Sequence, residues 1–202
     1  MRGTNTVAAC IKRRQVVAYP ASQQNWTKPA PTGTLGKRHW PTTHAPATLS
    51  AMKTRLSLAT ISDWLGREVG PSDWVTVTQE RINQFADATG DHQWIHIDAE
   101  RAAKESPFGT TIAHGYLTLS LVPLFKDQCM EYVDIKMGVN YGTNRVRFMA
   151  PVKVDSRVRA RFKLLETEEI KGGVQMVWET TIEIEGHAKP ACVAEIVTRV
   201  YA

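Results

Sequence analysis

The longest apolar run of the chain, residues 113–125 (AHGYLTLSLVPLF), constrains the fold more than any other stretch. Leu117, Leu121 and Leu124 follow the i, i+4, i+7 spacing of one helix face, and further apolar residues cover the other faces. A helix that is apolar on all sides is a buried helix. We therefore expect a long central helix in this run, which Pro123 either kinks or ends at a new turn.

Downstream of Glu131 the sequence alternates between apolar and polar residues with a period of two, which is typical of half-buried strands. The alternation is clearest in residues 157–164 and 174–185, on either side of a Lys-Gly-Gly segment. We expect a β-hairpin here, and residues 191–201 as the last strand of an antiparallel sheet.

The register of this hairpin depends on the length of its loop. A two-residue Gly-Gly loop pairs Lys171 with Val174 and mixes the apolar and charged faces. A three-residue loop pairs Ile170 with Val174, which places Arg161 opposite Glu183 and keeps both faces uniform. We favour the three-residue loop for that reason.

Shorter helices are predicted upstream of the apolar run. Residues 57–65 fit a short amphipathic helix, and residues 79–89 fit a helix with Thr78 as its N-cap and Gly90 as its end. Asp98 is the predicted N-cap of a third helix. The pattern as a whole indicates an α+β domain in which the helices mainly precede the strands.

Asp91 and His96 are the candidate catalytic pair. On one continuous helix their side chains, five positions apart, would point about 140° away from each other. Gly90 removes this obstacle, because a glycine with positive φ ends the preceding helix and leaves both side chains on a turn. A carboxylate and a histidine that converge on one water molecule can catalyse addition of that water to an activated double bond.

His114 and Gly115 stand at the head of the predicted central helix. The first N–H groups of a helix have no partner inside it and lie at the positive end of its dipole. Because Gly115 has no side chain, a substrate oxygen can approach its N–H, which is a candidate oxyanion donor. His114 is a candidate substrate-binding residue, and a role as N-cap is the alternative.

These residues resemble the MaoC-like (R)-specific enoyl-CoA hydratases and dehydratases, in particular the NodN-type branch. The shared pattern is an Asp, four residues and a His, followed by His-Gly at the head of the central helix. A second matching segment is residues 139–152 (VNYGTNRVRFMAPV), and the similarity covers about residues 55–202. Gln93-Trp94 stands where the family commonly has Asn-Pro, a departure that bears on substrate preference more than on chemistry.

The resemblance implies a hot-dog fold, in which a curved antiparallel sheet wraps a long central helix. It also implies a homodimer with a substrate tunnel near the subunit interface, and a thioester of CoA or of acyl carrier protein as the substrate. The expected reaction is the reversible hydration of trans-2-enoyl-CoA to (R)-3-hydroxyacyl-CoA, a hydro-lyase reaction. Neither a cofactor nor a metal is expected, because the thioester carbonyl already polarises the alkene.

In this reaction Asp91 is the expected general base for a water that His96 also holds, and the Gly115 N–H faces the enolate oxygen. Asn140 and Tyr141 are further candidates for substrate contact, with a bend in the strand as the alternative explanation. Two other functions remain open: a thioesterase on the same fold, and a non-catalytic protein that binds acyl thioesters. The presence of both a base and an imidazole disfavours the binding protein.

The distribution of charge separates a leader, residues 1–51, from a predicted catalytic domain, residues 52–202. The leader holds seven of the 25 Lys and Arg residues and none of the 20 Asp and Glu residues, so the domain has a formal charge of −2 although the whole chain has +5. This distribution argues against nucleic-acid binding. A hydrophobic fraction of 43% in 202 residues fits one globular domain.

The leader is rich in Pro, Thr, Ala and Gln, and we expect it to be disordered. We consider three explanations for this leader: a transit peptide, a translation start at Met52 that leaves the leader untranslated, and a binding tail. The start at Met52 agrees best with the position at which the resemblance begins. Three widely spaced cysteines without a CxxC motif indicate a reducing compartment, either the cytoplasm or an organellar matrix. No apolar segment approaches the ~18 residues of a membrane span.

Overall fold

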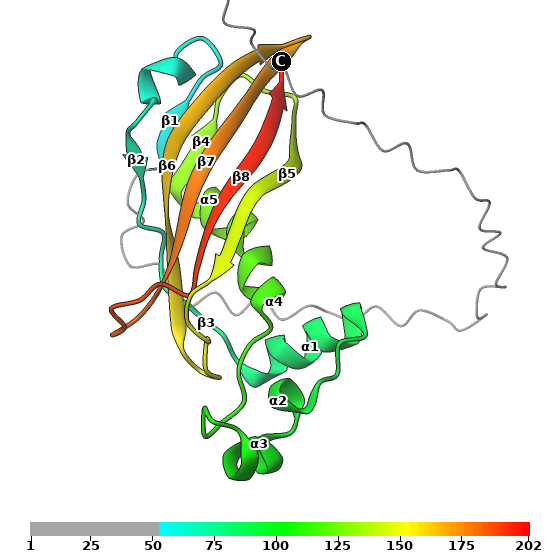
Figure 1. The fold of residues 1–202 in the computed structure, drawn as a ribbon. Coiled ribbons are helices and arrows are strands. Elements are labelled where there is room, and N and C mark those ends of the chain that lie inside the picture. The colour runs from blue at the N-terminus through cyan, green and yellow to red at the C-terminus, as the bar shows by residue number, and fades with distance from the viewer. Residues whose placement is uncertain (1–52) are drawn as a thin grey trace, which may run out of the picture. The chain divides into compact units, whose positions relative to one another are not determined.

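Four long strands form most of the main sheet in a computed structural model that describes residues 53–202 (Figure 1). They are β5 (Met137–Phe148), β6 (Arg157–Ile170), β7 (Gly173–Ile184) and β8 (Cys192–Tyr201). The strand order is β2-β6-β7-β8-β5, with β2 at Glu68–Val69, and β3 (Val75–Thr76) also pairs with β6. The pairs within this sheet are antiparallel, as the alternating pattern predicts.

The two faces of β6 and β7 differ as the sequence predicts. Phe162, Leu164 and Trp178 are fully buried on one face, whereas Arg157 and Lys163 on the other face are exposed. This apolar face packs on the helices, so the alternation has placed the hydrophobic core on one side of the sheet.

The predicted register of the hairpin is wrong. Ile170 pairs with Gly173 across a two-residue Lys171-Gly172 turn, in which Gly172 has a φ of 79°. A bulge between Leu164 and Glu166 then shifts the pairing by one more residue. Gly173 belongs to the strand rather than to the loop, because it lies so close to the Val200 carbonyl of β8 that a Cβ atom would overlap it.

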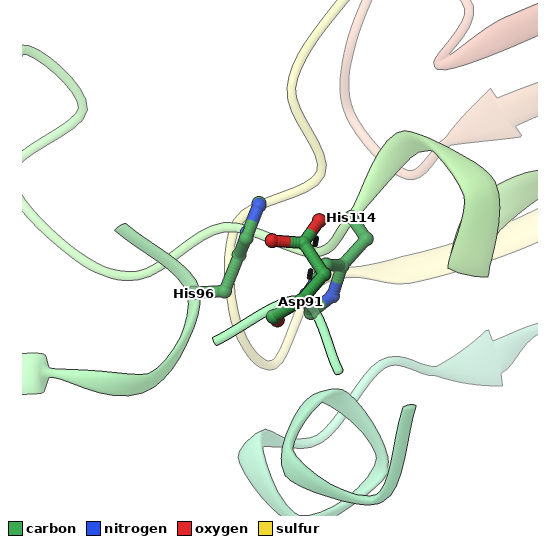
Figure 2. Close-up of side chains that lie close together, drawn as sticks. All are labelled: Asp91, His96 and His114. Carbon is green, nitrogen blue, oxygen red and sulfur yellow. Dashed lines mark hydrogen bonds and ion pairs between the residues drawn. The ribbon is translucent and has the colours of Figure 1, made fainter. Parts of the chain in front are cut away.

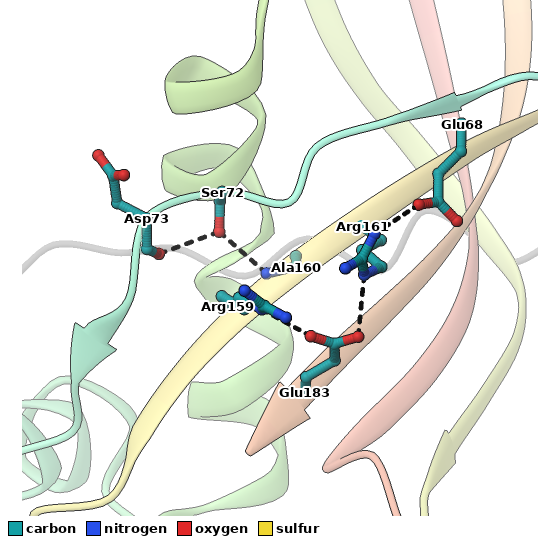
Figure 3. Close-up of polar contacts among 7 residues, drawn as sticks. All are labelled: Glu68, Ser72, Asp73, Arg159, Ala160, Arg161 and Glu183. Atoms are coloured by element: carbon teal, nitrogen blue, oxygen red, sulfur yellow. Dashed lines mark hydrogen bonds and ion pairs between the residues drawn. The ribbon is translucent and has the colours of Figure 1, made fainter. Parts of the chain in front are cut away.

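Although the register differs from the predicted one, arginines of β6 still lie opposite a glutamate of β7 across this hairpin (Figure 3). Arg159 pairs with Glu183 in the observed register, with 2.6 Å between Nε and Oε2. Arg161 bridges Glu183 and Glu68, at 3.0 Å and 2.8 Å. The Ser72 hydroxyl accepts the Ala160 N–H nearby, so the segment around β2 is tied to β6 through both charge and backbone.

The central helix consists of two consecutive helices, α4 (Gly115–Ser120) and α5 (Val122–Cys129). Leu121 separates them, and Pro123 lies in the first turn of α5, where its missing N–H costs no helical hydrogen bond. Of the two alternatives for Pro123, a new helical segment is the one observed. The sheet curves around α4 and α5 (Figure 1), and Leu117, Leu121 and Phe125 are buried against it.

The expectation that this helix is buried on all sides is wrong for the single chain. Tyr116 is 72% exposed and Leu124 is 40% exposed, although neighbouring residues of α4 and α5 are buried. The sheet covers one face of the helical pair only. Apolarity on every side shows that a helix avoids water, but it does not identify which faces its own chain covers.

Three helices gather at one end of the sheet (Figure 1). They are α1 (Gln79–Thr89), α2 (Trp94–Ile97) and α3 (Ala99–Glu105). The predicted caps are present, since the Thr78 hydroxyl accepts the Arg81 N–H and the Asp98 carboxylate accepts the Arg101 N–H. Gly90 ends α1 with a φ of 77°.

The predicted helix at residues 57–65 is wrong. This region contains only the short 3-10 helix η1 (Ile61–Trp64), preceded by β1 (Thr54–Leu56), which pairs in parallel with β4 (Met130–Tyr132). Leu56 is fully buried as a strand residue, so tertiary packing determines the conformation of this short segment.

The predicted leader, residues 1–51, lies outside the described residues. Among the helices of residues 53–202, none has the length and hydropathy that crossing a membrane requires.

Candidate active site

Asp91, His96 and His114 lie together although 23 positions separate the first from the last (Figure 2). One atom from each side chain, a ring nitrogen or a carboxylate oxygen, lies within 4.8 Å of the corresponding atoms of the other two. Asp91 follows Gly90 after the end of α1, and His96 lies on α2 rather than on an open turn. His114 immediately precedes α4.

The imidazole of His96 is held in one tautomer by its hydrogen bond to the Ile112 carbonyl, with 2.7 Å between Nδ1 and O. A carbonyl can only accept, so Nδ1 carries the proton and Nε2 presents a lone pair. Burial lowers the pKa of His96, and the nearby His114 lowers it further, against the opposing effects of the Ile112 bond and the Asp91 charge. His96 is therefore a neutral hydrogen-bond acceptor at neutral pH.

His114 holds the turn that carries Asp91. Its Nε2 donates to the Asp91 carbonyl at 2.9 Å, and its ring stacks on the His96 ring with 3.8 Å between the centroids. His114 is the N-cap residue of α4 by position, as the alternative expects, but its side chain makes no capping hydrogen bond to that helix. Its buried Nδ1 has no hydrogen-bond partner among residues 53–202, and it therefore offers a second lone pair at this site.

The carboxylate of Asp91 remains accessible, with its side chain 57% exposed and Oδ2 4.0 Å from His114 Nε2. Because His114 binds the Asp91 backbone rather than engaging the carboxylate closely, the oxygens are free to bind a water or a substrate hydroxyl. Figure 2 shows the carboxylate beside the His96 ring, so one small molecule can contact both groups.

A cavity of about 280 Å³ adjoins His96, whereas Asp91 and His114 are not among its lining residues. Its polar lining comes from His96, Gly115 and Thr118, and the rest is mainly apolar and includes Phe148. The first backbone hydrogen bond of α4 joins the Thr118 N–H to the His114 carbonyl, so the Gly115 N–H precedes the helical ladder. A Cβ atom on Gly115 would lie 2.9 Å from the Phe148 ring, so only glycine fits here without displacing that ring.

Gln79 supports the site in a way that sequence reasoning missed. Its Nε2 donates to the His96 carbonyl at 2.7 Å, and its Oε1 accepts the buried Thr111 hydroxyl. Gln79 thereby links α1, α2 and the segment before α4. Its sequence position indicates only a residue in the first turn of a helix, which carries no signal of this contact.

Asn140 and Tyr141 do not line the cavity beside His96. Asn140 lines two other cavities, and the Tyr141 ring lies under the Arg199 guanidinium at 3.4 Å on the exposed face of β5. Their predicted contact with a substrate therefore stays a prediction.

A metal ion is a further possibility at Asp91, His96 and His114, which together offer one carboxylate and two imidazoles. The two rings are stacked with 27° between their planes, so their lone pairs lie in nearly parallel planes, which does not favour convergence on one point. One nitrogen of each ring also donates to a backbone carbonyl. This geometry suits a network of hydrogen bonds to water better than a tetrahedral metal centre.

The family is shown by comparison with known proteins. Residues 61–186 match the family model described as the MaoC like domain. This chain belongs to the MaoC-like domain family. The 3-hydroxyacyl-thioester dehydratase Z of Mycobacterium tuberculosis is 55% identical over 152 residues, which are 75% of this chain and 100% of the relative. Nodulation protein N of Rhizobium leguminosarum is 51% identical over 146 residues, covering 71% of this chain and 90% of the relative.

Solved structures show the same fold. The monoamine oxidase regulatory protein from Archaeoglobus fulgius has a TM-score of 0.63 at 23% identity, covering 74% of this MaoC-like chain and 96% of that chain. The (R)-hydratase from A. caviae involved in PHA biosynthesis has a TM-score of 0.54 at 24% identity, covering 66% and 94%. The predicted family and hot-dog fold are confirmed, and so is the predicted reaction class, a hydratase or dehydratase.

Proposed function

We propose that this MaoC-like protein catalyses the reversible hydration of trans-2-enoyl-CoA to (R)-3-hydroxyacyl-CoA. The observation that carries the proposal is the Asp91 carboxylate beside the ring of a buried, neutral His96, whose Nε2 is unprotonated and which lines a cavity together with Gly115. Two adjacent acceptors can hold both hydrogens of one water and aim its oxygen at a substrate carbon.

In the hydration direction, the water oxygen attacks C3 of the enoyl thioester while Asp91 removes one of its protons. The π electrons of the alkene move to the thioester carbonyl, whose oxygen becomes an enolate near the Gly115 N–H. C2 then takes the proton that the water lost, delivered by Asp91 directly or through His96. One O–H bond and the π bond between C2 and C3 break, one C–O bond and one C–H bond form, and dehydration follows the same steps in reverse.

The names of the relatives support the proposed substrate. A hydroxyacyl thioester is part of the name of the relative with 55% identity, and (R)-hydratases are among the structures with this fold. The reaction requires an acidic hydrogen at C2, which a thioester carbonyl provides without a cofactor. CoA is the proposed carrier, with acyl carrier protein as the alternative.

A homodimer is the proposed assembly. One similar structure is described as a complex of dehydratase subunits, HadBC of Mycobacterium tuberculosis, with a TM-score of 0.55 at 19% identity. In the single chain, Tyr116 and Leu124 are exposed apolar residues on the central helices. A second copy over this face would bury them and would shield the Asp91 carboxylate from bulk water.

A reducing compartment is the proposed location, with the cytoplasm as the simplest case. Cys129 and Cys192 are buried free thiols, and burial raises the pKa of each to about 11. Such thiols are inert toward disulfide exchange, and they fit an environment that makes no use of disulfide bonds.

The direct test is the incubation of the purified full-length protein with crotonyl-CoA. We expect the absorbance of the conjugated thioester to fall and chiral analysis to identify (R)-3-hydroxybutyryl-CoA. Release of free CoA without a hydroxyacyl product would instead identify a thioesterase. Saturable binding without turnover would identify an acyl-thioester binding protein.

Gln79 should act as a positioning residue for His96. In a Gln79→Leu variant the His96 carbonyl and the Thr111 hydroxyl lose their shared partner, so we expect kcat to fall roughly tenfold while KM changes little. Steady-state kinetics with crotonyl-CoA, together with a thermal melt, measure this effect.

Gln84→Leu is the matched control, because Gln84 lies on the same helix and its amide contacts only the exposed Glu80 carboxylate. This control should retain normal kcat. If Gln79→Leu lowers the melting temperature but leaves kcat unchanged, Gln79 contributes to stability alone.

A further inference from the structure

Lys126 is a buried basic residue that the proposed reaction does not use. It lies on α5 with only 9% of its surface exposed, and its ammonium donates to the Thr198 hydroxyl at 2.9 Å. Within residues 53–202 no carboxylate lies within 4.0 Å of it. Burial lowers the pKa of Lys126 to about 7, so at neutral pH its ammonium and neutral amine forms coexist, and a bound anion would favour the ammonium form.

The ammonium of Lys126 lies at the wall of a cavity of about 550 Å³. Thr198 and Asn140 line the same cavity beside apolar residues such as Ile135 and Val200. The ammonium has three N–H donors and Thr198 accepts one, so donors remain for a ligand. The Thr198 hydroxyl hydrogen is also free to donate, since its oxygen is the acceptor in this bond.

The other charged residues of this cavity do not neutralise Lys126. Asp127 and Glu131 are exposed at the rim, and Asp127 pairs with Lys53 at 3.4 Å. Tyr132 directs its hydroxyl toward the sulfur atoms of Met130 and Met176. Among the described residues that line this cavity, Lys126 is therefore the one buried basic group, beside the neutral donors of Thr198 and Asn140.

Three cavities follow one another along the central helices, from the one beside His96 and Gly115 to the one beside Lys126. A third cavity of about 210 Å³ lies at the junction of α4 and α5, next to the middle of β5 and β8, and shares Pro123 and Asn140 with the Lys126 cavity. The Lys126 cavity and this third cavity lie between the central helices and the two strands β5 and β8, whereas the cavity beside His96 lies at the start of α4 and the end of β5. The eleven helical steps from Gly115 to Lys126 correspond to about 16 Å, a span that an extended acyl chain can cover.

We propose that Lys126, with Thr198 and Asn140, binds a carboxylate at the far end of the acyl chain, so that the preferred substrates are enoyl thioesters with a terminal carboxyl group. This inference rests on the proposed function for the position of the thioester. A carboxylate supplies the missing counter-charge and accepts hydrogen bonds from the ammonium, the hydroxyl and the amide. Asn140 then contacts substrate at its far end rather than at the reacting carbons.

The test compares two trans-2-enoyl-CoA substrates of equal chain length, one ending in a methyl group and one in a carboxylate, over a series of lengths. We expect wild-type protein to prefer the carboxylate at one length by at least tenfold in kcat/KM. Lys126→Met should remove this preference and leave kcat/KM for the methyl-terminated substrate unchanged. The control Lys53→Met, at the exposed rim of the same cavity, should retain the preference.

A binding measurement separates this inference from the proposed function. Calorimetry with a saturated acyl-CoA that ends in a carboxylate needs no turnover, and we expect at least tenfold weaker binding to Lys126→Met than to wild type. If neither substrate is hydrated but this difference in binding persists, the proposed reaction fails and the carboxylate site stands. If methyl-terminated substrates are hydrated and neither rates nor binding depend on the terminal carboxylate, the inference is overturned.

Thr198→Val provides a second variant, because it removes the hydroxyl that contacts Lys126 and nearly preserves the shape of the side chain. It should reduce the preference in the same direction as Lys126→Met. Replacing a buried charge with methionine is commonly neutral or stabilising, and a thermal melt verifies the fold of both variants.

Discussion

The Asp91→Asn variant should hydrate crotonyl-CoA with a kcat about 10²-fold or more below that of wild type. The amide is nearly isosteric with the carboxylate, so the Asp91 carbonyl can keep its hydrogen bond from His114. What the variant loses is the ability to accept a proton from water. Stopped-flow or steady-state absorbance of the conjugated thioester measures the rate.

Asp87→Asn is the control for this experiment. Asp87 lies near the end of α1, just before the turn that carries Asp91, and pairs with the exposed His92. Neither Asp87 nor His92 lines the cavity beside His96. Its replacement should leave kcat within about twofold of wild type, because exposed ion pairs contribute little. If Asp91→Asn folds normally and retains the wild-type rate, Asp91 is not the base.

The His96→Asn variant should lose a similar factor, about 10²-fold or more in kcat. The asparagine amide can donate to the Ile112 carbonyl as Nδ1 does, but nothing replaces Nε2 as the second acceptor for the water. Because burial lowers the pKa of His96, the wild-type ring is neutral at pH 7 and above, and the loss should be present across that range. Rates at pH 7 and pH 8 measure it.

His92→Asn is the matched substitution outside the site, since His92 is exposed and contacts Asp87. We expect it to behave as wild type. A His96→Asn variant with near-normal kcat would show that the Asp91 carboxylate alone holds the water, and would remove His96 from the proposed mechanism.

The candidate catalytic residues could be selected from the sequence, because the signals that mark them are local. Gly90 ends α1, and this break allows Asp91 to leave the helix axis and approach His96. The spacing of an acid and a histidine, followed by His-Gly before an apolar run, is a pattern within 25 consecutive residues. The structure brings Asp91, His96 and His114 together and places Gly115 at the adjoining cavity.

The partners of these residues were not identifiable in that way. Gln79 contacts the His96 carbonyl from 17 positions away. The His114 side chain binds the backbone of Asp91 rather than making a capping hydrogen bond in its own helix. Such contacts depend on how α1, α2 and α4 pack against one another. No capping rule or periodicity encodes the distance between two helices.

The sequence by itself determined the ends of α1 through Thr78 and Gly90, and the buried face of β6 and β7 through alternation, because a cap or a pleat involves only neighbouring residues. Only the tertiary structure decided the register of the hairpin, which depends on a bulge near Leu165 and on the close approach of β8 to Gly173. It also decided the burial of Lys126 beside Thr198, 72 positions away. Contacts between distant segments set these features, and those contacts form and contribute free energy only when the whole chain has packed.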